Sequence, residues 1–167
     1  MGLAQGAQPV ISYNFGAQNA TRVREGFRIL FVFSVVYAFV LWLFFMICPG
    51  LFAKIFTDNQ ELVAYSKWAI RIYFAVSGMF GIQIACQQTF VAIGKAKISL
   101  FLAVLRKIIL LIPLIFILPL IFKNNQVLGV LIAEPIADGI AVSVTGILFI
   151  IFFNRSLKGL KQEKINE

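Results

Sequence analysis

Two long stretches of the sequence contain no charged residue, and they decide what kind of fold is open to this chain. Ile29 to Cys48 is twenty residues long, and Ile72 to Ile93 is twenty-two. A helix rises about 1.5 Å per residue, so about 20 mainly apolar residues cross the roughly 30 Å hydrocarbon core of a bilayer. Both stretches are therefore predicted to be transmembrane helices.

Two further spans carry charges near or inside the apolar run. Counting back from Phe122 gives a third span that begins at Ala103. Arg106 and Lys107 lie about one turn inside this start, so we expect both side chains to snorkel to the interface. A fourth span covers residues 127–153. The predicted fold is an all-α, polytopic membrane helix bundle.

The composition is typical of a bilayer protein rather than of an enzyme. Of the 167 residues, 60% are hydrophobic, whereas the apolar share of soluble domains is roughly half. The sequence has no histidine, which removes His-based catalytic triads and most zinc sites. We expect no enzyme activity, no cofactor and no metal. Cys48 and Cys86 lie in apolar runs and are predicted to be inert packing residues.

The charges indicate how the chain is oriented in the membrane. Nucleic-acid binding needs cations clustered on a soluble surface, and none of the charged segments provides one. Eleven of the 15 Lys and Arg residues lie in segments 16–28, 94–107 and 154–167, and four lie in segments 49–71 and 123–126. By the positive-inside rule the first set is cytoplasmic. We therefore expect a multi-pass protein of the inner (plasma) membrane with a cytoplasmic C-terminus.

Capping residues mark the ends of the predicted helices. Residues 1–15 cover only about 22 Å as a helix, so we predict a partial helix that is capped by Gly16. Asn19 is predicted to begin a short amphipathic helix. Before the second span, Asp58 with Glu61 three residues later resembles a capping box.

Polar side chains inside the helices are candidates for a substrate or ion pathway. Gln8 shares a helix face with Gln5 and Ser12, and this face needs water, a neighbouring helix or lipid headgroups. Gln83 and Gln87 are four residues apart and share a face. A buried glutamine needs partners, which another helix, water or a passing ligand can supply. The candidate pathway residues from these helices are Gln8, Asn14, Gln83 and Gln87.

Small residues and prolines predict how the second and third spans pack. Ser77 and Gly81, with Gly78 between them, let helices approach closely. Pro113 and Pro119 predict a kinked or curved third helix with locally freed carbonyls. Such helices occur both in moving transporter segments and in static spans.

Two acids inside the fourth span are the main anomaly of the sequence. Glu134 and Asp138 are one turn apart and face the same way, about 9 Å and about 15 Å from a boundary near Leu128. An unpaired charge at this depth costs several kcal/mol, so each acid must be protonated, paired or exposed to an aqueous cavity. Two such carboxylates suit proton or cation exchange. A structural alternative is that one acid pairs with a cation of a neighbouring helix or caps a kink at Pro135.

Four segments together resemble the C-terminal half of the multidrug and toxic-compound extrusion (MATE) family. They are "GAQPVISYNFGAQNATRVREGFRI" at 6–29, "IFTDNQELVAYSKWAIRIY" at 55–73, "QQTFVAIGKAKISLFLAVLRKIILLIPL" at 87–114 and "GVLIAEPIADGIA" at 129–141. The resemblance implies a twelve-helix secondary antiporter with two six-helix lobes. Such a protein expels organic, often cationic, drugs in exchange for protons or sodium.

On this resemblance the chain would be a fragment that matches the end of the eighth helix through the twelfth. The implied partners are drug-like cations, protons or sodium, the lipid bilayer and a missing N-terminal lobe, with no nucleic acid. The implied organisation is a partial C-terminal lobe at 1–153, with a partial helix at 1–15, spans near 29–48, 68–93, 100–122 and 127–153, and a cytoplasmic tail at 154–167.

The sequence departs from the family at its coupling acids. These acids lie mainly in the first, seventh and tenth helices, and the span that matches the tenth, Ile72 to Ile93, contains no acid. No coupling residue is therefore carried over, and the case for Glu134 and Asp138 rests on their depth. Two other functions stay open. One is a lipid-linked oligosaccharide flippase of the same superfamily, which would need basic residues deep in the spans, and the other is a non-transporting, truncated membrane module.

Overall fold

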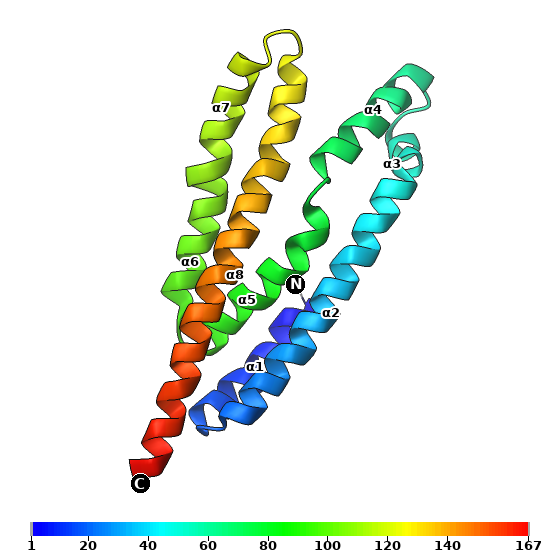
Figure 1. Ribbon diagram of the computed structural model, residues 1–167. Helices are drawn as coiled ribbons and strands as arrows, with labels where there is room; N and C mark the ends of the chain where they lie inside the picture. Colours follow the sequence, from blue (N-terminus) through cyan, green and yellow to red (C-terminus); the bar gives the residue numbers. More distant parts are fainter. Residues whose placement is uncertain (1, 167) are drawn as a thin grey trace.

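A computed structural model describes the chain over residues 2–166, with side chains through Leu160. All regular structure in this part is helical, and the helices form an elongated bundle (Figure 1). In chain order the elements are α1 (Gly2–Gly16), α2 (Ala20–Ile47), α3 (Pro49–Phe56), α4 (Gln60–Tyr73), the 3-10 turn η1 (Ser77–Met79), α5 (Phe80–Ala92), α6 (Ala96–Val104), the π-helical segment η2 (Leu105–Leu111), α7 (Ile112–Ile121) and α8 (Gln126–Asn166).

Three helical stretches of the described chain are long and apolar enough to cross a bilayer. They are α2, the continuous stretch Ala96–Ile121 and the part of α8 over Gln126–Leu160, with mean hydropathies of 2.6, 2.6 and 2.3. A fourth crossing is available if α4 and the segment Ser77–Ala92 form one span that is bent by 45°. The molecule is therefore a helical membrane bundle.

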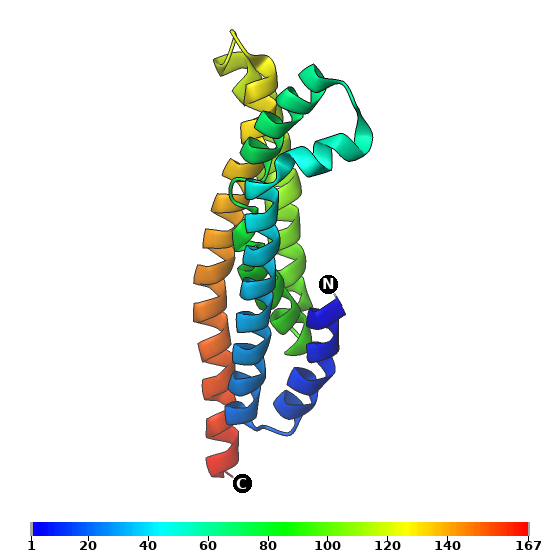
Figure 2. The same cartoon turned by 90° about the vertical axis from the view of Figure 1, so that its right-hand side faces the viewer.

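The connecting segments gather at two ends of the bundle. The α1–α2 loop, the α5–α6 turn and the C-terminus lie toward one end, which we call the C-terminal end (Figures 1 and 2). The short helix α3, the α3–α4 loop and the α7–α8 turn lie toward the opposite end. The N-terminus lies partway along the length of the bundle.

The predicted second span, at 68–93, is not one straight helix. The α-helix stops at Tyr73 and resumes at Phe80, which produces the 45° bend. The carbonyl of Phe74 at this break accepts hydrogen bonds from Trp42 Nε1 at 3.0 Å and from Ser77 Oγ at 2.9 Å. The backbone nitrogen of Ser77 donates to the same carbonyl at 3.1 Å, so the acceptor at the break is satisfied inside an apolar bundle.

Glycines of the same segment lie directly against α2. A Cβ atom added at Gly81 would lie 2.6 Å from the Cα of Val35, and one added at Gly78 would lie 3.0 Å from Cγ of Trp42. The close helix approach that the small residues predict is therefore confirmed. Only glycine leaves room for the α2 backbone at position 81.

The cap predictions hold in part. Asn19 Oδ1 accepts a hydrogen bond from the backbone nitrogen of Arg22, but the helix that follows is α2 itself, so the predicted short amphipathic helix is wrong. The left-handed residue of the α1–α2 loop is Gln18, with φ 54°, rather than Gly16. Asn59, one residue after the predicted Asp58, caps α4.

The last helix runs on past the predicted end of the fourth span at residue 153. It is helical to Asn166, because Phe153, Leu157 and Leu160 continue a buried stripe along one face. The segment expected as a tail at 154–167 is thus helical where it is described, and Glu167 and the side chains beyond Leu160 lie outside the described part. The stripe joins an aromatic group near the C-terminal end, which consists of Phe27, Phe90, Phe149 and Phe153.

Candidate functional site

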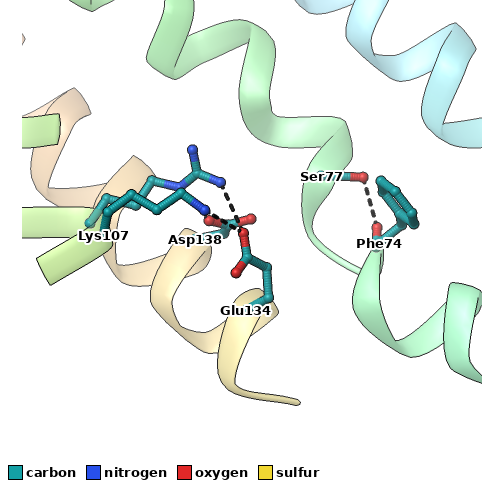
Figure 3. Close-up of polar contacts among 6 residues, drawn as sticks. Phe74, Ser77, Lys107, Glu134 and Asp138 are labelled. Carbon is teal, nitrogen blue, oxygen red and sulfur yellow. Dashed lines mark hydrogen bonds and ion pairs between the residues drawn. The ribbon is translucent and has the colours of Figure 1, made fainter. Parts of the chain in front are cut away.

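Four charged side chains from η2 and the first third of α8 meet inside the spanning part of the bundle. Arg106 Nε lies 2.5 Å from Asp138 Oδ1, and Arg106 Nη2 lies 3.3 Å from Glu134 Oε1. Lys107 Nζ lies 2.9 Å from the same Glu134 oxygen. Figure 3 shows Lys107 directed toward Glu134 and Asp138. We call these four residues the ion-pair cluster. When all four are ionised its formal charge is zero.

The cluster is largely enclosed by protein. The exposed fractions of the side chains are 4% for Asp138, 10% for Glu134, 16% for Arg106 and 52% for Lys107. The guanidinium carbon of Arg106 also lies 4.1 Å from the centre of the Phe80 ring, in a cation–π contact. Arg106 is therefore enclosed against α8 and α5 and does not snorkel as predicted, whereas about half of the Lys107 side chain stays exposed.

The helix boundaries explain this difference. The helical stretch begins at Ala96 rather than near residue 103. Ten residues of helix, about 15 Å, therefore separate its start from Arg106. Both cations lie too deep for their side chains to reach the C-terminal end of the bundle.

A distorted helix supplies the two cations. Arg106 and Lys107 are consecutive residues of the π-helical segment η2. Pro113 follows and has no backbone N–H, so the carbonyl of Ile109 lacks its usual helical donor. The prolines predict a kink or a curve, and the irregularity that the structure shows just before Pro113 is a stretch of π turns, which often occur at functional sites.

A regular helix supplies the two acids. Glu134 and Asp138 face the same way because they are four residues apart, and α8 continues as one helix through Pro135. Of the alternatives that the sequence left open, pairing with cations of a neighbouring helix is the one observed.

Pairing makes these buried charges tolerable without making them inert. Desolvation of two ions offsets much of their mutual attraction, so a buried pair contributes little net stability, yet removing one partner leaves a costly bare charge. A proton or a monovalent cation that neutralised Asp138 or Glu134 would therefore weaken the hold on Arg106. The cluster can exchange one positive charge for another.

Phe80 connects the cluster with the bent helix. Its ring lies under Arg106, and the residue follows directly after η1 and the break at Phe74. Figure 3 shows Phe74 and Ser77 of this break on the element beside the cluster. Phe80 also lines a groove of about 600 Å³ between α1, α2 and α5. The aromatic residues that line this groove are Phe33, Tyr37, Trp42, Phe45, Phe74 and Phe80.

The remaining candidate residues lie on α5 and α1. Gln83 is buried, and Gln87 is half-buried one turn further along α5. On α1, Gln8 is half-buried, and Asn14 Nδ2 donates to the carbonyl of Val10 in its own helix at 2.8 Å. No hydrogen bond between described residues joins α1 to the ion-pair cluster. The structure therefore brings Glu134 and Asp138 together and leaves the α1 candidates apart.

Sequence reasoning missed Arg106, Lys107 and Phe80 as members of the site. The sequence did contain a signal for the two cations. They lie in the third spanning stretch and the two acids lie in the fourth, and the short turn between these stretches makes them antiparallel neighbours. Within the described residues, no group of three or more His, Cys, Asp or Glu side chains lies close enough to hold a metal ion.

Comparisons with known proteins give the family. The sequence model of the MatE family matches residues 1–117. The chain is 23% identical over 145 residues to the multidrug export protein MepA of Staphylococcus haemolyticus (strain JCSC1435). The aligned residues cover 86% of this chain and 32% of that protein.

Solved structures agree with this match. The chain is 33% identical to the MATE multidrug transporter DinF-BH, solved in complex with R6G, with a TM-score of 0.83 over 94% of this chain and 34% of that one. A second solved chain is 32% identical, with a TM-score of 0.82. The chain spans about a third of the length of these relatives. The family match covers well over half of the chain, and the chain belongs to the MatE family of multidrug and toxic-compound extrusion transporters.

Proposed function

We propose that this chain forms part of a secondary antiporter that exports organic, often cationic, compounds in exchange for protons or sodium. The observation that carries the proposal is the pair of buried acids, Glu134 and Asp138, held by Arg106 within the spanning helices. Intramembrane ionisable residues of this kind mark ion and proton pathways in transporters. The relatives support the class of cargo, because they are named as multidrug proteins and one was solved with R6G.

The exchange step follows from the geometry of the cluster. Binding of a proton or sodium ion at Asp138 or Glu134 removes the negative charge that holds Arg106. Arg106 then keeps its contact with Phe80 but loses one of its two carboxylate partners. Because Phe80 adjoins the break at Phe74, a shift of Arg106 favours a different bend of this span. Two such states with different ion affinities are what coupled transport requires.

We place the protein in the inner (plasma) membrane with its C-terminus in the cytoplasm. The charge bias supports this orientation in a corrected form. Arg106 and Lys107 lie within the third spanning stretch and pair with acids of α8, so removing these two from the eleven cations first counted leaves nine against four. The bias keeps its sign.

The alternatives are less well supported. A flippase for lipid-linked oligosaccharides would need positive charge in excess, to hold a pyrophosphate. The deep cations Arg106 and Lys107 are matched by two acids, so the cluster offers no such excess. A non-transporting module would have no use for buried charges that need pairing. Drug tolerance and dye efflux distinguish this module from a transporter.

Expression in a drug-sensitive host tests the proposal. Alternating access needs one lobe to move against another, so the chain alone should leave drug tolerance unchanged. Co-expression with a portion of a relative that covers the helices this chain does not match should raise tolerance. Failure of every such combination would favour the non-transporting module. Energised dye efflux by the purified chain alone in liposomes would contradict the claim that it is one part of the transport unit.

The same co-expressed transporter tests the role of the acids. Asp138→Asn should alter the pH dependence of efflux more than it alters the protein level. The double variant Glu134→Asn/Asp138→Asn should lose coupling altogether. Wild-type efflux by the double variant would reduce both acids to a structural role.

A further inference from the structure

Three buried side-chain atoms on α5 and α8 have no hydrogen-bond partner within the described part of the chain. They are Gln83 Oε1, Gln87 Nε2 and Thr145 Oγ1. Gln83 is 3% exposed and Thr145 is 0% exposed. A buried polar atom without a partner costs about 1–3 kcal/mol, so three on two neighbouring helices need a physical explanation.

Two contacts fix how α5 and α8 lie relative to each other. At one level, Arg106 joins Phe80 of α5 to Asp138 of α8. At a second level, the ring centres of Phe90 on α5 and Phe149 on α8 are 5.3 Å apart. The levels are ten residues apart on α5 and eleven on α8, so the two helices run in the same direction with matched rise.

The unpaired atoms lie between these two levels. Gln83 and Gln87 follow Phe80 by three and seven residues and so occupy its face of α5. Thr145 follows Asp138 by seven residues, which puts it on the acid's face of α8 and at the level of Gln87. Ala141, a fully buried small residue, is at the level of Gln83. The polar atoms thus form a column that starts at the ion-pair cluster.

The donors and acceptors in this column select the ligand. Gln83 Oε1 accepts hydrogen bonds, Gln87 Nε2 donates them, and the Thr145 hydroxyl does both. A bound metal cation would need oxygen ligands throughout, and an amide nitrogen is not one. Water both donates and accepts, and ordered water is the usual partner of buried polar groups that lack one.

We propose that the seam between α5 and α8 holds a short chain of water molecules, which runs from Gln87 and Thr145 past Gln83 to Asp138, and that protons reach Asp138 along it. The second part rests on the proposed function, and the first does not. A proton delivered by the nearest water bonds to a carboxylate oxygen of Asp138, while Arg106 keeps its charge. Besides Arg106, the charged groups around Asp138 are Glu134 and Lys107.

The aromatic group of Phe27, Phe90, Phe149 and Phe153 lies between the column and the C-terminal end of the bundle. Phe149 stacks on Phe27 at 4.4 Å and on Phe153 at 4.7 Å, and Phe90 meets its ring nearly edge-on. Four apolar rings at this level leave the water chain no polar exit. Protons can therefore pass to this end only in a conformation that separates the rings.

Thermal unfolding of the chain in lipid nanodiscs tests the water chain without any transport assay. Thr145→Val and Gln87→Met each remove one anchor and should each lower Tm by roughly 2–4 °C. The double variant should lose less than the sum, because both residues hold the same waters. An unchanged or higher Tm in the single variants would overturn the proposal, since an apolar group in place of an orphaned polar atom is neutral or stabilising.

Matched controls come from the same helix. Thr145→Ser keeps the hydroxyl and should retain a Tm near that of the wild type. Ser143→Ala removes an exposed hydroxyl that donates to the carbonyl of Gly139 in its own helix, so it should leave Tm unchanged. If Ser143→Ala lowered Tm as much as Thr145→Val does, the effect could not be assigned to buried water, and the assignment would be overturned.

Radiolytic hydroxyl labelling in ¹⁸O water provides a measurement on the wild-type chain, which does not depend on variants that fold. Cys86 and Phe90 flank Gln87 and are 2% and 0% exposed. Internal water beside them should produce ¹⁸O-labelled Cys86 and Phe90, and the Gln87→Met/Thr145→Val variant should lose this label. An unlabelled wild type would overturn the water chain.

The co-expressed transporter tests the proton route. The Gln87→Met/Thr145→Val variant should bind dye as the wild type does but lose efflux driven by a pH gradient. Full pH-driven efflux in a variant that has lost the ¹⁸O label would overturn the proton route and leave the water chain standing. If the wild-type combination itself fails to transport, the proposed function fails, and the unfolding and labelling results alone decide the water chain.

Discussion

Arg106 donates from Nε to Oδ1 of Asp138 across 2.5 Å, although the two residues are 32 positions apart in the sequence. The pair links the π-helical segment η2 of the third spanning stretch to the first third of α8. The side chain of Asp138 is 4% exposed, so bulk solvent does not reach the carboxylate to replace the guanidinium. The buried carboxylate of Asp138 is therefore stabilised chiefly by its ion pair with Arg106.

We expect Arg106→Met to destabilise the chain by about 3–5 kcal/mol, because it leaves Asp138 buried without a partner. Replacing both residues, as in Arg106→Met/Asp138→Leu, should recover most of the loss, since an apolar pair of similar volume avoids the desolvation of two ions. Denaturant unfolding in nanodiscs measures both. A double variant no more stable than Arg106→Met would contradict this account.

Lys107 provides the matched control for this experiment. It pairs with Glu134 at 2.9 Å, but its side chain is 52% exposed. Lys107→Met leaves Glu134 a second partner, Arg106 at 3.3 Å, whereas Arg106→Met removes the partner of Asp138, so Lys107→Met should cost less than Arg106→Met. Equal losses in the two variants would show that the pairing of Asp138 does not distinguish the two cations.

Gly81→Ala should weaken the packing of α5 on α2. The added Cβ would lie 2.6 Å from both the carbonyl carbon of Ser34 and the Cα of Val35, and backbone atoms cannot move aside as a flexible side chain can. Overpacking of this kind costs about 1–3 kcal/mol. Gly146→Ala is the control, because nothing lies within 4 Å of its Cβ position. We expect this second change to be neutral or slightly stabilising in thermal unfolding.

The sequence predicts much of the fold, because apolar run length is set by bilayer thickness. Uncharged runs place α2 and the second span, and the four-residue spacing of Glu134 and Asp138 puts both acids on one face of a helix. Asn19 is recognisable as a cap because a side-chain oxygen just before a helix satisfies a free backbone N–H.

The misses come from contacts between residues far apart in the chain. The break at Phe74 contains no proline, and what makes it stable is a donor from Trp42, 32 residues away. The depth of Arg106 depends on where its helix begins, and no cap residue marks that start at Ala96. Sequence periodicity carries neither kind of information.

Trp42→Phe should loosen the bend between α4 and α5. The change removes the donor to the Phe74 carbonyl but keeps an aromatic ring beside Gly78. Ser77 Oγ still donates to the same carbonyl, so the loss should be only about 0.5–1.5 kcal/mol.

Adding Ser77→Ala should cost more than the sum of the single changes, because the carbonyl then keeps only the backbone N–H of Ser77, at 3.1 Å, as a donor. Thermal unfolding gives the energies, and faster amide hydrogen exchange at residues 74–79 would locate the effect. Additive losses would mean that the two donors do not share one acceptor in the membrane.

Cysteine labelling tests the orientation of the bundle. Single cysteines at Asn125 and Lys158, in a background without Cys48 and Cys86, report on opposite ends of α8 (Figure 1). The nine-to-four bias of cations predicts that the Lys158 end lies in the cytoplasm. In whole cells a membrane-impermeant maleimide should therefore modify Asn125→Cys and spare Lys158→Cys, while permeabilised cells should show both modified. Modification of Lys158→Cys from outside, with Asn125→Cys protected, would reverse the orientation and put the C-terminal end of the bundle on the outer face.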